Sequence, residues 1–181
     1  MSFQPHTRCR EIVLQVLYML DHNTGLSQEE IEQFLTLRLR EPSWRDEARG
    51  LIDGIRRHRK AIDQVISDLA RNWRLDRMAA IDRNVLRLGT YEVLYRVDVP
   101  VAVAITEAVE LVKRFGSAQS SRFVNGILGK VPQVEGDFPR RKRAASETSK
   151  AVAPTDVATD CEDSDPVGDP PSPAAAEERD E

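Results

Sequence analysis

Apolar residues recur every three or four positions along most of the chain, and this spacing constrains the fold more than any other feature. It predicts helices over about 7–22, 28–40, 43–73, 78–96, 100–115 and 120–131. The polar run 56–59 is expected to interrupt the third stretch, which gives about seven helices. No stretch alternates apolar and polar residues as a half-buried strand does, so the sequence predicts an all-α fold.

Helix-end signals support these boundaries. Ser27 and Glu30 have the spacing of a capping box, in which serine caps the backbone and glutamate reaches back to the cap residue. Gly116 is expected to terminate the helix before it, because glycine favours helix ends. Ser120 or Ser121 is expected to cap the last helix.

Composition changes near Pro132. Seven of the 10 prolines lie from Pro132 to the end, in a segment rich in Ala, Ser, Pro, Asp and Glu. Such a segment buries too little apolar surface to offset the entropy of ordering. We therefore expect a helical domain over 1–132 and a disordered tail over 133–181.

The net charge of −4 is unevenly distributed. Residues 1–143 carry 24 lysines and arginines against 19 aspartates and glutamates, a net charge of +5, whereas residues 144–181 carry 2 against 11. A mildly basic body permits nucleic-acid binding without demanding it. The basic run 140–143 is either a solvated linker or an accessory contact to phosphates.

Motifs for catalysis or metal binding are absent from the sequence. The segment 126–131 contains Gly-Lys, but its spacing is wrong for a phosphate-binding loop. Cys9 and Cys161 lie far apart, and the three histidines form no metal-ligand pattern. We expect no enzyme activity, cofactor or metal. No apolar stretch is long enough to span a membrane, and 1–10 lacks the apolar core of a signal peptide, so a cytoplasmic location is expected.

The first helix carries two sets of side chains outside its main apolar stripe. Arg8, Glu11 and Gln15 share a polar face, which suits contacts to phosphates and base edges or is simply solvated. Leu14 and Tyr18 form an additional apolar pair. This pair packs either against a neighbouring helix or against a partner protein.

The connection between the last two helices is the densest candidate site. Lys113 and Arg114 end one helix, and Arg122 stands at the start of the next, where helix ends attract anions. Phe123 lies at the edge of an apolar stripe, where it either packs inside or stacks on an unpaired base. Gly126 lowers helix propensity, which indicates a close approach there, most simply by a neighbouring helix.

Several segments resemble the NusB family of bacterial transcription antitermination factors. The resemblance covers about residues 7–131. It is carried by Arg10-Glu11 with Gln15-Val16-Leu17-Tyr18, by the segment 82–94, and by Asp98-Val99-Pro100 with the segment 104–116. Arg122-Phe123-Val124-Asn125-Gly126-Ile127-Leu128 completes it. The resemblance implies two roughly perpendicular three-helix bundles. It also implies a heterodimer with the ribosomal protein NusE that binds boxA RNA of ribosomal RNA leader transcripts and joins an antitermination complex on RNA polymerase.

The resemblance also assigns residues. It implies RNA contacts by a basic first segment and by the last inter-helix connection, here Arg8, Arg10, Lys113, Arg114, Gln119, Arg122 and Phe123. We add Gln15 from its place on the polar face. Tyr18 and Asp82 match the NusE-facing surface, to which we add Leu14. The family often has a dense arginine cluster at its start, and the thinner one here predicts weaker or more partner-dependent RNA binding.

Two other interpretations fit part of the sequence. Some RNA cytosine methyltransferases carry a NusB-like domain beside a catalytic domain, but the region after 132 is expected to be a tail without a nucleotide-binding fold. An interaction or dimerisation module without sequence-specific RNA binding is the stronger alternative, because some family members form homodimers.

Overall fold

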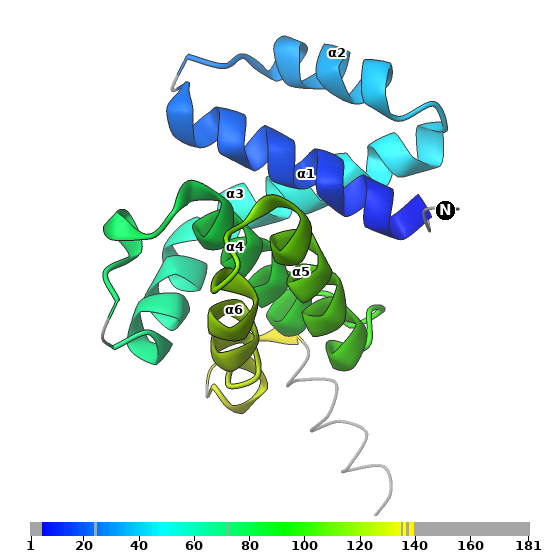
Figure 1. Ribbon diagram of the computed structural model, residues 1–181. Coiled ribbons are helices and arrows are strands. Elements are labelled where there is room, and N and C mark those ends of the chain that lie inside the picture. The colour runs from blue at the N-terminus through cyan, green and yellow to red at the C-terminus, as the bar shows by residue number, and fades with distance from the viewer. Residues whose placement is uncertain (1–4, 24, 72, 135, 137, 140–181) are drawn as a thin grey trace, which may run out of the picture. The chain divides into compact units, whose positions relative to one another are not determined.

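The computed structural model describes residues 5–23, 25–71, 73–134, 136 and 138–139. Within these ranges the chain is helical and has no strand, so the prediction of an all-α fold is confirmed (Figure 1). The α-helices are α1 (Pro5–His22), α2 (Gln28–Arg38), α3 (Pro42–Leu69), α4 (Ala80–Tyr95), α5 (Val101–Phe115) and α6 (Ser120–Leu128). Two short 3-10 helices cover Leu75–Arg77 and Val131–Gln133.

The six α-helices form two groups that cross one another. In Figure 1, α1 and α2 lie together with the first part of α3, and α4, α5 and α6 run crosswise to them. Helix α3 packs against both α1 and α4 and so belongs to both groups. The predicted pair of crossed bundles is confirmed, with α3 as the shared element.

The predicted interruption at 56–59 is wrong, because α3 continues through this run without a break. Ile55 and Ile62 are both buried on the inner face. Between them, His58 stacks on Tyr95 of α4, with ring centroids 4.2 Å apart. The polar residue therefore takes the place of an apolar one, and six α-helices result instead of about seven.

Helix starts follow the predictions in one case and differ in another. The capping box at α2 is confirmed: the Ser27 hydroxyl accepts from the Glu30 N–H at 3.2 Å, and the Ser27 N–H donates to the Glu30 carboxylate at 2.8 Å. The expected serine cap at α6 is wrong. Gln119 precedes the helix without a side-chain cap, and Ser120 bonds Asp82 and the preceding loop instead.

Packing continues beyond the predicted domain end at 132. Val131 is fully buried, and Val134 and Phe138 are half-buried against the core. The Phe138 ring meets Tyr95 edge-on, with centroids 5.6 Å apart. The basic run 140–143 and the rest of the tail lie outside the described residues.

Substituting Gly89 by alanine should destabilise the second helix group. A Cβ at Gly89 of α4 would lie 2.7 Å from a methyl carbon of Leu128 and 3.3 Å from the Cβ of Ala108. Both neighbours are buried, so we expect a loss of about 1 to 3 kcal/mol. Gly50→Ala is the matched control: its Cβ would meet nothing within 4 Å, so it should stabilise α3 by about 0.5 to 1 kcal/mol. Urea denaturation of both variants tests the contrast, and equal effects would contradict it.

Candidate nucleic-acid and partner interfaces

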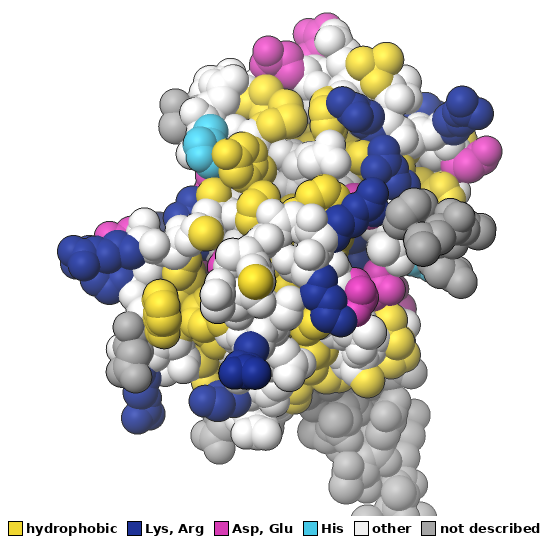
Figure 2. Space-filling model, in the orientation of Figure 1, with side chains coloured by type: hydrophobic (Ala, Val, Ile, Leu, Met, Phe, Trp, Pro, Cys, Tyr) yellow, Lys and Arg dark blue, Asp and Glu magenta, His cyan; other side chains and the backbone are white. Residues whose placement is uncertain are grey.

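A buried glutamate joins two arginines from distant parts of the chain. Glu11 of α1 has a side chain only 1% exposed, and its carboxylate accepts a hydrogen bond from Arg8 at 2.8 Å. The other carboxylate oxygen accepts from Arg114 at the end of α5. The two arginine side chains are 40% and 46% exposed, so two cations that share one anion reach the surface side by side. Figure 2 shows basic side chains in a band over this part of the molecule.

The connection between α5 and α6 is anchored to the start of α4. The Ser120 hydroxyl donates to Asp82 at 2.8 Å and accepts from the Ser117 N–H at 3.1 Å. The second Asp82 oxygen is buried and has no hydrogen-bond partner among the described residues. Asp82 therefore positions this connection, and its NusE contact remains a prediction.

The other predicted RNA residues of this region lie at the surface or half-buried. Lys113 is exposed and pairs with Glu110 at 2.6 Å. Gln119 and Arg122 are exposed at the loop and the first turn of α6. Phe123 is half-buried, with its ring 5.4 Å from that of Trp73. The anchored connection thus displays cations, an amide and an aromatic edge within a short segment.

Arg10 does not belong to this surface. It is 5% exposed, and its guanidinium binds both carboxylate oxygens of Glu92 in α4 at 2.7 to 3.1 Å. Glu107 of α5 lies 3.8 Å away on the other side. The structure argues against the predicted RNA contact, because this side chain joins three helices inside the protein. Val13 and Leu17, which follow Arg10 on the same helix face, are also buried, and this spacing could have indicated its position.

An apolar groove of about 290 Å³ lies beside the Glu11 cluster. Leu14 forms part of its lining at 2% exposure, and Tyr18 rises from it at 40% exposure and stacks on His22 at 4.1 Å. Gln15, which the sequence predicts on the polar face of the helix, also lines this groove. It therefore lies beside Leu14 and Tyr18, the predicted partner-binding residues. Four further lining residues, one from each of four helices, carry no role in the sequence-based prediction: Met19, Phe34, Ile81 and Phe115.

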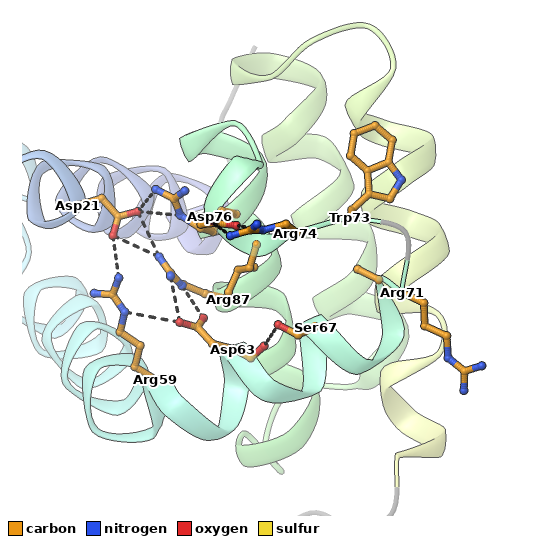
Figure 3. A pocket seen from close by; sticks show the side chains of 12 residues that line it. Asp21, Arg59, Asp63, Ser67, Arg71, Trp73, Arg74, Asp76 and Arg87 are labelled. Atoms are coloured by element: carbon orange, nitrogen blue, oxygen red, sulfur yellow. Dashed lines mark hydrogen bonds and ion pairs between the residues drawn. The ribbon is translucent and has the colours of Figure 1, made fainter.

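A network of charges ties the end of α1 to α3 and α4 (Figure 3). Asp21 accepts hydrogen bonds from Arg59, Arg83, Asn84 and Arg87, and Arg87 also pairs with Asp63 through two bonds of 2.7 and 3.0 Å. All of these residues except Asn84 line part of an open cavity of about 840 Å³. The network holds the two helix groups together and leaves few of its cations available to a ligand.

Metal and thiol chemistry have no evident site in the described part of the chain. No group of three His, Cys, Asp or Glu side chains there is placed to hold a metal ion. Burial raises the pKa of the Cys9 thiol to about 12, which keeps it protonated and unreactive. None of the described helices combines the length and apolar character that a membrane span requires.

Crossed helical bundles with a cationic surface and an adjoining apolar groove define a class of helical binding adaptors. The chain belongs to the NusB family, whose model matches residues 7–133. Members of this family are transcription antitermination factors and not enzymes, as the sequence analysis predicted.

Curated relatives and solved structures agree with this membership. The transcription antitermination protein NusB of Myxococcus xanthus is 48% identical over 126 residues, which cover 67% of this chain and 90% of the relative. The corresponding protein of an Anaeromyxobacter species is also 48% identical and covers 76% of this chain and 94% of its own length. NusB of T. maritima matches with a TM-score of 0.66 and 35% identity over 80% of this chain and 99% of that structure. A NusB chain solved with NusE and double-stranded RNA has the same fold, with a TM-score of 0.65 and 24% identity over 73% of this chain and 98% of that chain.

Proposed function

We propose that this protein binds boxA-type RNA of ribosomal RNA leader transcripts together with NusE, within an antitermination complex on RNA polymerase. The observation that carries the proposal is the paired display of Arg8 and Arg114 on Glu11, beside the anchored connection that presents Arg122. Exposed cations attract the phosphates of RNA, and the neighbouring aromatic edge suits an unstacked base. Transcription in bacteria takes place in the cytoplasm, so the predicted location follows from the same proposal.

The apolar groove supports NusE as the protein partner. Its lining is formed mainly by hydrocarbon and aromatic side chains, with Gln15 and Glu11 at polar positions. Phosphates find no cation there, whereas an apolar side chain of a partner protein would fill it. Because Glu11 borders both the groove and the arginine pair, a bound partner would lie directly beside bound RNA.

RNA titrations with and without NusE test the proposal. We expect tighter binding to RNA that contains boxA than to a scrambled RNA of the same composition, and a larger difference when NusE is present. Log affinity falls with log salt concentration. Replacing Lys113 and Arg122 by alanine should make this fall less steep, by about 0.7 in the slope for each cation lost. Arg57→Ala, at an exposed position in α3, should leave the slope unchanged. If neither condition shows a preference for boxA, the interaction module without sequence-specific RNA binding is the correct interpretation.

A further inference from the structure

A second open cavity, of about 620 Å³, lies between the end of α3 and α6. We call it the Trp73 cavity. It adjoins the predicted RNA residues Arg122 and Phe123, but most of its lining comes from residues that the family resemblance does not assign. The lining includes two aromatic residues, three cations and a glycine, which are Trp73, Phe123, Arg71, Arg122, Lys130 and Gly126.

Trp73 leaves a large aromatic surface in water. Its side chain is 62% exposed, and the only ring contact found for it among the described residues is with Phe123, tilted by 55° at 5.4 Å. Figure 3 shows the indole extending away from the Asp21 network. Two adjacent aromatic rings that are incompletely buried form a platform on which a flat ligand could stack.

Within the part of the chain that the structure describes, the cations around this platform have no ion-pair partner, in contrast to those of the neighbouring network. Arg71, Arg122 and Lys130 are exposed, and none has an ion-pair partner among the described residues. Asp68 also lines the cavity, and its carboxylate accepts from Gln64 at 2.8 Å. Three cations against one carboxylate leave a positive local charge, which favours a ligand with several anionic groups.

Gly126 keeps one wall of the cavity open. A Cβ at this position would meet nothing within 4 Å, so the neighbouring helix expected from the sequence is not the reason for the glycine. Glycine within a helix costs about 1 kcal/mol relative to alanine. No contact inside the described protein offsets that cost, whereas a ligand that approaches the α6 backbone would use the space.

We propose that the Trp73 cavity binds single-stranded RNA, with an unstacked base on Trp73 and Phe123 and phosphates on Arg71, Arg122 and Lys130. The cations come from the segment after α3, the start of α6 and the segment after α6, which matches successive phosphates of a strand better than one free anion. The inference rests on the proposed RNA-binding function. It extends the RNA path from the α5–α6 connection to the end of α3.

Fluorescence and affinity measurements on the full chain test this site. In a Trp44→Phe background, Trp73 is the remaining tryptophan, and a stacked base should quench its emission. The probe is a boxA RNA with an unpaired extension of about six nucleotides at each end. An extension of this length lies within the range of site sizes that single-strand binding proteins cover. We expect saturable quenching, and about tenfold weaker binding for Trp73→Ala. Leu37→Ala, an 82% exposed apolar side chain on α2, is the control and should bind as the wild type does.

A second variant separates binding from folding. Gly126→Leu should fill the open wall without loss of stability, because its surroundings are empty, and should weaken binding of the same RNA several-fold. If the wild-type protein binds the RNA and both variants bind it with the same affinity as the wild type, the inference is overturned and the proposed function stands. Quenching of Trp73 by NusE in the absence of RNA would also overturn it, since the surface would then be a protein interface. A wild-type protein that binds no RNA would overturn the proposed function together with the inference.

Discussion

Replacing Glu92 by alanine should lower the free energy of unfolding by about 3 to 5 kcal/mol, because it leaves the buried charge of Arg10 without its main partner. The two side chains are 1% and 6% exposed and share three hydrogen bonds. Glu107, at 3.8 Å, is too distant to replace those bonds. Urea denaturation followed by circular dichroism measures the loss.

The double variant Arg10→Leu with Glu92→Met is the informative control. Burial raises the pKa of Glu92 even though Arg10 hydrogen-bonds to it, so the pair carries a large desolvation cost. Two apolar side chains should therefore recover most of the stability lost in the single variant. RNA affinity should equal that of the wild type, because Arg10 lies inside. A stable double variant with weakened RNA binding would show that Arg10 contacts RNA after all.

Local signals were sufficient to predict most helix boundaries. The apolar spacing and the Ser27–Glu30 capping box depend on residues within one or two turns, and the structure places α2 where they predict it. Inside the continuous helix α3, His58 stacks on Tyr95, a residue of another helix. No local pattern reveals such a contact, so the polar run 56–59 was interpreted as a break.

The candidate surfaces show the same limit more strongly. Residue type and the family resemblance identified Arg8 and Arg114, but only the fold shows that Glu11 holds them together. Trp73 ends the predicted helix 43–73 and has no role in the sequence-based prediction, although a tryptophan among arginines and outside any apolar stripe is an available signal. A sequence does not show which cations are paired, and that distinction separates Arg71 from the arginines bound to Asp21.

Replacing Asp21 by asparagine should destabilise the protein by about 3 kcal/mol near neutral pH, because it removes the anion on which three arginines converge. The Asp21 side chain is 4% exposed, and it pairs with Arg83 at 2.7 Å and with Arg59 and Arg87 at 3.1 Å. Since these cations come from α3 and α4, their mutual repulsion would act across the junction of the two helix groups. Asp46→Asn, at an exposed partner of Arg49, is the control and should cost less than about 1 kcal/mol.

The wild type and Asp21→Asn should differ in free energy of unfolding, and the pH dependence of that difference identifies the Asp21 carboxylate as its source. Burial alone would raise the pKa of Asp21, but hydrogen bonds from Arg83 and Asn84 and the charge of Arg87 outweigh it, so the pKa lies below the ordinary value of 3.8. A lowered carboxylate pKa contributes stability that is complete above the unfolded-state value and is lost as the pH falls through the folded-state value. The wild type should therefore lose its advantage over Asp21→Asn as the pH falls below about 4, as measured by urea denaturation from about pH 7 to about pH 3. An advantage that stays constant over this range would mean that the carboxylate charge does not hold the junction together, and that the asparagine acts through altered packing.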